Sequence, residues 1–338
     1  MMASILRAQG EIVTDAVEVP TPADDQVLIR IAAVGVCGSD IHYFHEGRIG
    51  DFVVDAPLIL GHEASGTIVA VGADVDAGRI GQRVAIEPQR PCRRCEQCRS
   101  GRYNLCTSIE FYATPPIDGA FAEYAAIQSD FAYAIPDSMS FDAAALCEPL
   151  SVGIWTAQKA GIRPGSSVLI AGAGPIGIIT AQVARAFGAT RVIVSDPVAE
   201  RRAVALRFGA TEVVDPIATD IAAAEWDVDA FIDASGAAPA IRAGVYAVGP
   251  AGRVVLVGMG ADEAPLPLSR IQNRELVVTG VFRYANTYPT AIALIEKGLV
   301  DLDSLVTHRF GLGEVVEALE AAGDPSALKV IVAPGEEG

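Results

Sequence analysis

The stretch at residues 167–189 constrains the fold of this chain most strongly. It reads SVLIA, then GAGPIG, then a run of apolar and small residues with a helical period. A buried strand that leads through a glycine turn into a helix is typical of dinucleotide-binding sheets. Of Gly172, Gly174 and Gly177, one makes the tight turn, one lets a pyrophosphate approach the backbone, and one allows close helix–strand contact. The N-terminus of the helix stabilises the phosphate charge.

Strand and helix patterns alternate after this turn. We expect a helix at 197–210, and short apolar strands at the following positions: 191–196, 212–215, 227–235, 252–258 and 275–282. Such alternation builds a parallel sheet with helices on both faces. The strands are almost entirely apolar, as burial on both faces requires.

The chain has two further stretches of different texture. Up to about residue 147, short β-type runs such as 26–36, 66–73 and 81–88 are broken by Gly and Pro. This pattern predicts a mostly β domain. From about residue 284 the sequence predicts two amphipathic helices and a final strand at 329–334. A length of 338 residues suits two domains.

Composition narrows the function classes. The chain is 51% hydrophobic and has 42 acidic against 25 basic residues, a net charge of −17. Such a charge repels phosphate backbones and anionic membranes, so we expect neither nucleic acid nor a membrane as partner. No apolar run reaches 18 residues, and the N-terminus lacks the pattern of a signal peptide. We therefore expect a cytoplasmic protein.

Four of the six cysteines are crowded into one segment. Cys92, Cys95, Cys98 and Cys106 have the spacing C-x2-C-x2-C-x7-C. Two-residue spacers let thiolates converge from a tight loop, and a later fourth cysteine completes a tetrahedral zinc site. Four thiolates leave no open coordination position, so this zinc would be structural.

Other readings of the cysteine segment are disulfides and an iron–sulfur cluster. Disulfides fit poorly without a secretory signal. An iron–sulfur cluster competes through its C-x2-C-x2-C spacing, but the usual fourth spacing and the trailing proline are missing. Arginines surround the segment and could suggest nucleic acid, which the acidic chain as a whole disfavours.

Asp196 ends the second strand of the predicted sheet, 19 residues after Gly177. A carboxylate there accepts hydrogen bonds from adenosine ribose hydroxyls and repels a 2′-phosphate, which favours NAD. Asp196 could also cap the helix that follows near Pro197. Arg201 and Arg202 lie nearby and keep NADP open as the alternative.

A second group of possible metal ligands is scattered along the chain. Cys37, His62, Glu63 and Glu148 each have an ordinary explanation as a buried thiol, a core histidine or a helix cap. A nicotinamide site in the same chain favours a metal-binding role for them, because hydride transfer from an alcohol requires loss of the hydroxyl proton. A zinc ion with three protein ligands and one open position supports that chemistry.

Seven segments of the chain carry a family resemblance. They are GVCGSDIHYF, GHEASGTIVAVG, the four-cysteine segment, ATPPIDGAFAEY, EPLSVG, GAGPIG and GVFRYANTYP. Together they resemble the zinc-containing medium-chain dehydrogenases, and within them the sorbitol/xylitol (polyol) dehydrogenases. The resemblance covers nearly the whole chain. It implies an α/β fold: a GroES-like, mostly β catalytic domain (1–149 and 284–338, with a zinc lobe at about 90–107) and a Rossmann NAD-binding domain (150–283).

The resemblance implies a catalytic zinc held by Cys37, His62 and Glu63, with Glu148 nearby and often linked through a water. Alcohol dehydrogenases of this superfamily have a cysteine where Glu148 falls, so the glutamate points to the polyol branch. A shift by one residue would make Cys147 the ligand. The EPLSVG string favours the register with Glu148.

The matching segments also imply substrate and cofactor contacts. Tyr43, Phe111 and Thr114 would line one side of the pocket and Arg283 and Tyr284 the other, with Glu148 also near the substrate. Ser39 and His42 match a proton relay. The alternative for Arg283 is an ion pair at the surface or at an interface. The implied cofactor contacts are Gly172, Gly174, Pro175, Ile176, Gly177, Asp196, Arg201, Val257, Gly258, Met259, Val281 and Arg283.

The resemblance therefore implies a homotetrameric enzyme with two zinc ions per subunit, one catalytic and one structural. It would oxidise a secondary hydroxyl of a polyol with NAD to give a ketose. Two alternatives stay open: a dehydrogenase of threonine, a simple alcohol or an aldose, and a non-catalytic protein that binds NAD and zinc.

Overall fold

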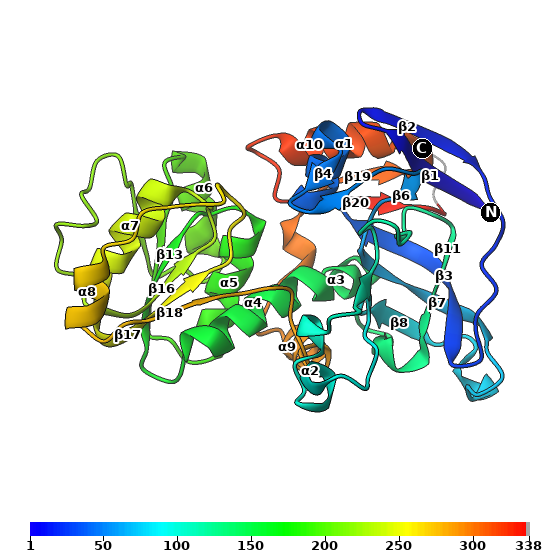
Figure 1. Ribbon diagram of the computed structural model, residues 1–338, viewed down its shortest axis with the longest axis horizontal. Helices are drawn as coiled ribbons and strands as arrows, with labels where there is room; N and C mark the ends of the chain where they lie inside the picture. The colour runs from blue at the N-terminus through cyan, green and yellow to red at the C-terminus, as the bar shows by residue number, and fades with distance from the viewer. Residues whose placement is uncertain (336–338) are drawn as a thin grey trace. The chain divides into compact units, whose positions relative to one another are not determined.

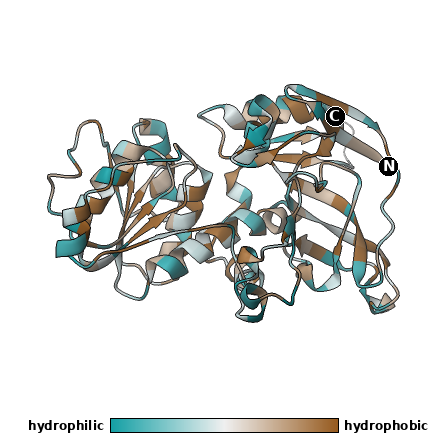
Figure 2. Ribbon diagram, in the orientation of Figure 1, coloured by the Kyte–Doolittle hydropathy of each residue, from teal (hydrophilic) through white to brown (hydrophobic). Residues whose placement is uncertain are grey.

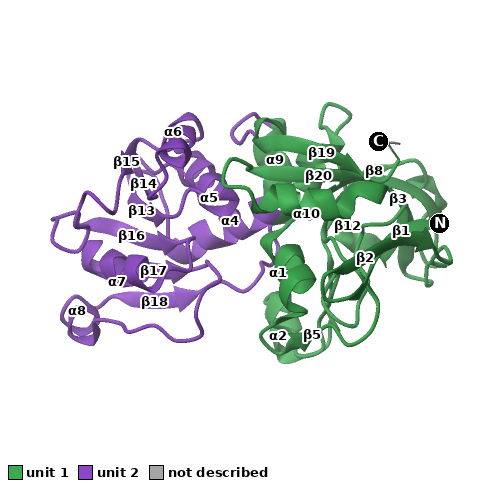
Figure 3. Ribbon diagram, turned by 90° about the horizontal axis from the view of Figure 1, so that it is seen from above, with its two compact units in different colours: residues 1–148, 288–296, 302–338 green, residues 149–287, 297–301 purple. Residues whose placement is uncertain are grey.

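The computed structural model describes residues 1–335, which divide into two compact units (Figure 3). Unit 1 contains residues 1–148, 288–296 and 302–338, and unit 2 contains residues 149–287 and 297–301. Among the described residues, no helix is both long and apolar enough to span a lipid bilayer.

Unit 1 is built mainly from antiparallel strands, and Figure 1 labels the longer ones. Its strands are β1 (Met2–Ala8), β2 (Glu11–Ala16), β3 (Gln26–Gly35), β4 (Arg48–Ile49), β5 (Phe52–Val53), β6 (Leu58–Ile59), β7 (Glu63–Val71), β8 (Arg83–Ile86), β9 (Gln89–Arg90), β10 (Glu110–Phe111), β11 (Tyr124–Gln128), β12 (Ala132–Ala134), β19 (Val306–Gly311) and β20 (Lys329–Ala333). Its helices are α1 (Gly38–Glu46), α2 (Glu96–Arg99), α3 (Phe141–Ala145), α9 (Tyr288–Glu296) and α10 (Val315–Gly323).

The largest sheet of unit 1 has the strand order β12-β8-β7-β3-β20-β19, and β11 also pairs with β3. This sheet brings distant parts of the chain together, because β20 pairs antiparallel with β3 through Ile331 and Gly35. The apolar residues of these strands form one core, which includes Ile29, Ile68 and Val332. The mostly β texture predicted for the first stretch is thus confirmed, and the sheet gains two strands from the C-terminal part of the chain.

Unit 2 is an α/β sandwich. Its strands are β13 (Ser167–Ala171), β14 (Arg191–Ser195), β15 (Glu212–Val214), β16 (Val228–Asp233), β17 (Val248–Leu256) and β18 (Val277–Gly280). Its helices are α5 (Pro175–Ala186), α6 (Ala199–Arg207), α7 (Ala238–Ala247) and α8 (Leu268–Asn273), and α4 (Cys147–Ala160) begins in unit 1 and continues into unit 2. The strands lie in the order β15-β14-β13-β16-β17-β18 and all pair parallel. In chain order this is 3-2-1-4-5-6, the order of a doubly wound dinucleotide-binding sheet.

The central strands of unit 2 are buried on both faces, and Figure 2 colours them as hydrophobic. Val168 and Ile170 of β13 pack on one face with α5 residues such as Ala181. Leu169 of β13 packs on the other face with Val245 of α7. The alternation along one strand explains why the sequence here reads as an uninterrupted apolar run.

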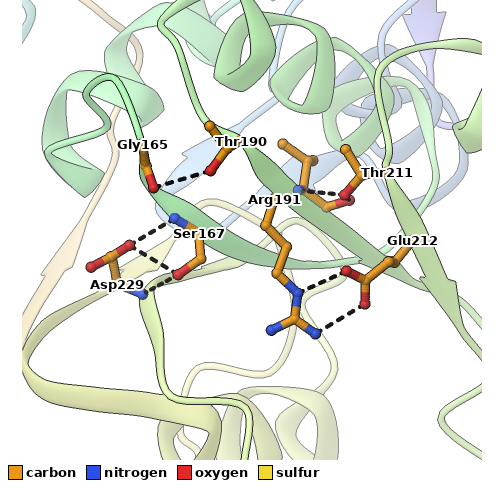
Figure 4. Close-up of polar contacts among 8 residues, drawn as sticks. Gly165, Ser167, Thr190, Arg191, Thr211, Glu212 and Asp229 are labelled. Atoms are coloured by element: carbon orange, nitrogen blue, oxygen red, sulfur yellow. Dashed lines mark hydrogen bonds and ion pairs between the residues drawn. The ribbon is translucent and has the colours of Figure 1, made fainter.

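Polar contacts fasten the amino-terminal ends of these strands (Figure 4). Asp229 accepts hydrogen bonds from the backbone N–H and the hydroxyl of Ser167, at 2.7 and 2.9 Å. Arg191 and Glu212 form a two-point ion pair at 2.7 and 2.9 Å across β14 and β15. These contacts stabilise the strand register at the amino-terminal ends. The glycine turn lies at the opposite, carboxyl-terminal end of β13.

Element boundaries differ from the sequence expectations in detail. The helix predicted at 197–210 begins at Ala199, because Asp196 Oδ1 accepts from the N–H of Val198 and holds these residues in a turn. The strand predicted at 252–258 begins earlier, at Val248, with an irregular register near its start. Helix α1 and strand β19 were not predicted, because both are short and only partly apolar.

Candidate metal centre and cofactor turn

Three predicted metal ligands meet in unit 1. The possible ligand atoms of Cys37, His62 and Glu63 all lie within 4.8 Å of one another. Cys37 follows β3 and precedes α1, His62 lies just before β7, and Glu63 is its first residue. The antiparallel pairing of Gly35 with Glu63 places these segments side by side.

Two glycines give this cluster its room. A Cβ on Gly35 would lie 2.0 Å from Glu63 Oε2, so only glycine leaves space for the carboxylate. Gly61 has a φ of +85°, and a Cβ there would lie 2.8 Å from the ring of Phe121. Glycine is favoured at such a φ because it has no Cβ. The LGHE segment therefore turns sharply and presents His62 to Cys37.

Asp40 joins the cluster, although the sequence analysis did not single it out. It is fully buried, and its carboxylate accepts from the N–H of Cys37 at 2.9 Å and of Gly61 at 3.0 Å. The same carboxylate lies 3.8 Å from His62 Nδ1. A carboxylate behind a histidine orients the ring of a metal ligand. The available signal was an acidic residue three positions after Cys37, the spacing of a helix capping box.

Lys329 is the second residue that sequence reasoning missed. Its Nζ contacts Glu63 Oε1 at 2.7 Å and Oε2 at 2.5 Å, and donates to the carbonyl of Val36 at 2.8 Å. Both side chains of the pair are buried. Burial lowers the pKa of Lys329, but the charges of Glu63, Cys37 and Glu148 outweigh it and raise the pKa overall. The ammonium group of Lys329 thus forms a buried ion pair with the carboxylate of Glu63.

The charged groups around His62 show whether the site is suited to a metal cation. Burial lowers the pKa of His62, but Asp40, Cys37 and Glu148 outweigh that effect and raise it to about 10. Such a site strongly favours a positive charge on or beside the imidazole. Cysteine, histidine and carboxylate together form a donor set that suits zinc. The residues present therefore fit a bound zinc ion.

Glu148 and Cys147 lie at the start of α4, and both are buried. Neither belongs to the close cluster of ligand atoms. The charge of Glu148 acts on the pKa values of both His62 and Lys329. Burial alone raises the pKa of the Cys147 thiol, which makes it a poor thiolate. These observations favour Glu148 over Cys147 as the residue that faces the site.

The other residues predicted around the substrate have varied positions. Phe111 is buried, with its ring centroid 5.5 Å from that of His62, and Tyr43 is buried on α1. Thr114 is half-buried in a turn after β10. Arg283, with a φ of +53°, and the fully buried Tyr284 belong to unit 2, where the guanidinium of Arg283 lies over the ring of Phe282.

The two residues of the predicted proton relay lie on α1. Ser39 is half-buried in the first turn of the helix. His42 is exposed, and its Nδ1 lies 3.0 Å from the carboxylate of Glu46, one turn further along the same helix. The structure does not join Ser39 and His42 by a hydrogen bond among its described residues, so the relay stays a prediction.

The four-cysteine lobe forms a compact cluster. The Sγ atoms of Cys92, Cys95, Cys98 and Cys106 all lie within 4.8 Å of one another, and all four are free thiols. Backbone N–H groups point at the sulfurs, as in the 3.4 Å contact from Cys98 to Cys95. Hydrogen bonds from the backbone lower the pKa of Cys92 to about 6, whereas burial raises that of Cys98 to about 12. The lobe offers four converging sulfurs and no disulfide, a donor set that fits zinc.

The glycine turn of unit 2 has the local geometry that the motif predicts. Gly172 has a φ of +99°, and a Cβ on Gly177 would lie 1.9 Å from the carbonyl oxygen of Gly172. By contrast, a Cβ on Gly174, the N-cap of α5, would meet nothing within 4 Å. The open space at Gly174 lies at a helix N-terminus, where backbone N–H groups can bind a pyrophosphate. The turn therefore fits a dinucleotide.

Asp196 links this turn to the next strand. It is buried, and its carboxylate accepts from the N–H of Ala173 and of Val198, both at 2.8 Å. Arg202 donates to the carbonyl of Asp196 at 2.6 Å and pairs with Asp215 at 3.1 Å, so its charge is compensated. The capping role considered for Asp196 is wrong, because Val198 is the N-cap of α6 and the Asp196 carboxylate holds the turn before the helix. The ribose-binding role stays a prediction, and the lone pairs of the two carboxylate oxygens leave room for it.

The remaining predicted cofactor residues lie along unit 2. Pro175 and Ile176 open α5, and Arg201 lies in α6. Val257 and Gly258 follow β17, and their N–H groups donate to the carbonyl of Asp233 at 2.9 Å. Met259 is 55% exposed, and Val281 follows β18. These residues remain predictions as cofactor contacts.

Comparison with known proteins places the chain in a family. Residues 23–137 match the alcohol dehydrogenase GroES-like domain, and residues 175–297 match the zinc-binding dehydrogenase domain. Sorbitol dehydrogenase of Bacillus subtilis is 41% identical over 99% of this chain and 97% of its own length. That of Rattus norvegicus is 43% identical over 97% of this chain and 94% of its own length.

Two solved structures with bound cofactors are similar throughout. A dehydrogenase from Sinorhizobium meliloti bound to NADP has a TM-score of 0.92 and 32% identity, covering 98% of this chain and 99% of its own. An alcohol dehydrogenase from Escherichia coli complexed with NADH has the same TM-score, 28% identity and the same coverage. By its domains, sheets and full-length sequence similarity, the chain belongs to the zinc-containing medium-chain dehydrogenases, in the branch of the sorbitol (polyol) dehydrogenases.

Proposed function

We propose that this chain oxidises a secondary hydroxyl group of a sorbitol-like or xylitol-like polyol to a ketone, with NAD as the hydride acceptor and zinc at the active site. The observation that carries the proposal is the cluster of Cys37, His62 and Glu63 in a chain 41% to 43% identical to two sorbitol dehydrogenases. A glutamate rather than a cysteine at position 148 supports the polyol branch.

Cys37, His62 and Glu63 would hold the catalytic zinc, with Glu148 facing it, directly or through a water. When bound, zinc would lower the pKa of an alcohol hydroxyl and NAD would accept the hydride from its carbon. Asp40 accepts a hydrogen bond from the N–H of Cys37 and lies 3.8 Å from His62 Nδ1, so its charge would favour the placement of both ligands. Lys329 fixes the carboxylate of Glu63.

The other residues would bind substrate and move its proton. Tyr43, Phe111 and Thr114 would contact the polyol, and Phe111 already flanks His62. Arg283 and Tyr284 are the further residues that we propose as substrate contacts. The hydroxyl proton would leave through Ser39 and His42, or through a water held by Glu148. His42 is exposed and can pass a proton to solvent.

NAD rather than NADP is proposed because of Asp196. A 2′-phosphate would be repelled by the carboxylate at the end of β14, and Arg202 is engaged by Asp215. Arg201 remains the residue through which NADP could be accommodated.

The second zinc would be held by Cys92, Cys95, Cys98 and Cys106, giving two zinc ions per subunit. We also propose a homotetramer. Strand β18 is the edge strand of its sheet, and Val277 on it is 45% exposed. An edge strand of this kind can pair with a second copy of itself.

A panel of polyols, threonine, simple alcohols and aldoses, read by absorbance of the reduced cofactor with NAD and NADP in parallel, tests the function. Turnover of polyols with NAD supports the proposal. Turnover of threonine alone would select the other dehydrogenase activity, and no turnover by zinc-replete protein would favour a non-catalytic role. Cys37→Ser and His62→Ala should each abolish turnover and leave the circular dichroism spectrum unchanged.

A further inference from the structure

Glu87 is a buried acid that the proposed reaction does not use. It follows β8 directly, and its side chain is fully inaccessible to solvent. Its backbone N–H donates to the carbonyl of Phe131 at 2.8 Å, so its position is fixed by the pairing of β8 with β12. A charged group in such a place costs free energy unless it is well compensated.

The two oxygens of this carboxyl group have different surroundings. Oε1 accepts hydrogen bonds from the hydroxyl of Tyr103 at 2.8 Å and from Nε2 of Gln89 at 3.0 Å. Oε2 is sealed from solvent and has no hydrogen-bond partner among the described residues. A carboxylate needs several donors to be stable in the interior, whereas a carboxylic acid needs fewer.

Tyr103 belongs to the four-cysteine lobe, since it lies between Cys98 and Cys106 in the chain. Its ring packs edge-on against Phe131, with centroids 5.5 Å apart and planes at 75°. At the rim of the same contact, Arg93 of the lobe pairs with Asp130 at 2.5 Å. The rim pair is exposed and therefore weak, and the Tyr103–Glu87 hydrogen bond is a second, partly buried polar link between the lobe and the sheet.

Within residues 1–335, the groups that act on the carboxyl group of Glu87 include no cation. The groups that face it are Tyr103 from the lobe, Gln89 from β9, Tyr133 from β12 and Glu148 from α4. The pKa of Glu87 is raised to about 7 overall: burial is the largest cause and the charge of Glu148 adds to it, while the three neutral side chains partly oppose the rise. Asp130 adds a second negative charge near Tyr133. The surroundings thus favour the uncharged acid up to neutral pH.

We propose that Glu87 is a positioning residue that, as an uncharged carboxylic acid, connects the four-cysteine lobe to the main sheet of unit 1. The proton on Glu87 and the metal in the lobe are therefore bound cooperatively. The inference rests on the proposed lobe zinc and not on the choice of substrate. When Glu87 loses its proton, a buried negative charge forms on which the charge of Glu148 also acts unfavourably. Separation of the lobe from the sheet lowers the free-energy cost of this charge, because it lets water reach the carboxylate.

The direction of the pH effect follows from linkage. The pKa of Glu87 is higher in the folded state than its ordinary value of 4.5, so the folded lobe binds this proton more tightly. Its stabilising effect is present below pH 4.5 and is lost as pH rises to about 7. Cysteine thiolates give the opposite trend, because protonation at low pH releases zinc. The two effects are therefore separable.

The test is the rate of zinc loss to a coloured chelator between pH 6 and pH 8, measured on wild-type protein and on Glu87→Gln. The kinetic phase that disappears in Cys106→Ser is assigned to the lobe. Glutamine keeps the acceptor for Tyr103 and cannot ionise. We expect the ratio of wild-type to Glu87→Gln release rates to rise about tenfold over this range.

Tyr103→Phe should release lobe zinc faster than wild type at all pH values, since it removes the link. The matched control is Tyr112→Phe, because Tyr112 is another tyrosine of unit 1 whose hydroxyl donates a hydrogen bond, here to the carbonyl of Ala126 at 2.7 Å and not to Glu87. A release ratio that does not change with pH, or equal rates for the two tyrosine variants, would overturn the proposal.

Metal analysis of the wild type separates this inference from the proposed lobe zinc. If the lobe holds no zinc, the zinc assignment fails and urea unfolding tests the proton instead. Glu87→Gln should then abolish the loss of stability between pH 5 and pH 7, and an unchanged slope would contradict the role of Glu87.

Discussion

Lys329 and Glu63 form a buried ion pair behind the candidate metal centre, with Nζ 2.7 Å from Oε1 and 2.5 Å from Oε2. The two residues are 266 positions apart, and the pairing of β20 with β3 brings them together. Glu63 thus contacts Lys329 through both carboxylate oxygens, and one of its oxygens also lies within 4.8 Å of the donor atoms of Cys37 and His62.

Lys329→Met should destabilise the metal-free protein by about 3–5 kcal/mol, since it leaves an uncompensated buried carboxylate. Bound zinc would supply the missing positive charge, so the loss should be smaller in zinc-loaded protein. Urea unfolding with and without zinc measures both values. Lys297→Met, at an exposed lysine, is the control and should change little. An equal loss in both states would show that the lysine does not act through the metal site.

Asp40→Asn should lower the affinity for the catalytic zinc by about 10–100-fold. The amide keeps one acceptor for the N–H of Cys37 or Gly61 but loses the negative charge beside His62. Chelator competition gives the affinity. The comparison is Asp76→Asn, at an exposed aspartate that accepts from Gly78 at 2.9 Å. Unaltered zinc affinity in Asp40→Asn would mean that Asp40 only shapes the backbone.

The two glycines at the start of α5 should respond differently to alanine. In Gly177→Ala the new Cβ would lie 1.9 Å from a backbone oxygen, so the turn must shift and the melting temperature should fall. In Gly174→Ala the Cβ meets open space, so stability should hold while NAD affinity falls. Thermal unfolding and titration of NAD by fluorescence distinguish these effects. Normal NAD binding by Gly174→Ala would argue against a pyrophosphate at this turn.

Asp196→Asn should relax the preference for NAD without loosening the glycine turn, because asparagine keeps an acceptor for the N–H of Ala173. Asp196→Ala removes both the charge and the hydrogen bonds, and should also lower stability. The ratio of kcat/KM for NAD and NADP is the measurement. A wild-type enzyme that already prefers NADP would contradict the assigned role of Asp196.

The sequence predicted those parts of the site that lie in local motifs. The glycine turn, the four cysteines and the GHE segment each carry their own spacing, and the structure brings the members of each together. The strands of unit 2 were predictable because burial on both faces leaves an uninterrupted apolar run.

Residues that act across the sheet were not predictable in the same way. Lys329 opens an apolar strand, where a single lysine looks like an ordinary strand end until the strand order is known. Glu87 looks like a surface residue beside a proline, and its burial depends on residues far from it in sequence, such as Tyr103 and Glu148. Asp40 was also missed, although its three-residue spacing from Cys37 was visible in the sequence.

The most direct test of the account joins metal and substrate in one measurement. Wild-type protein with a verified catalytic zinc is assayed for NADH formation with sorbitol and xylitol, and again after dialysis against a chelator that empties the Cys37–His62–Glu63 site. The account predicts polyol oxidation that disappears with the metal and returns when zinc is restored. Turnover that persists in protein shown by metal analysis to lack this zinc would contradict it.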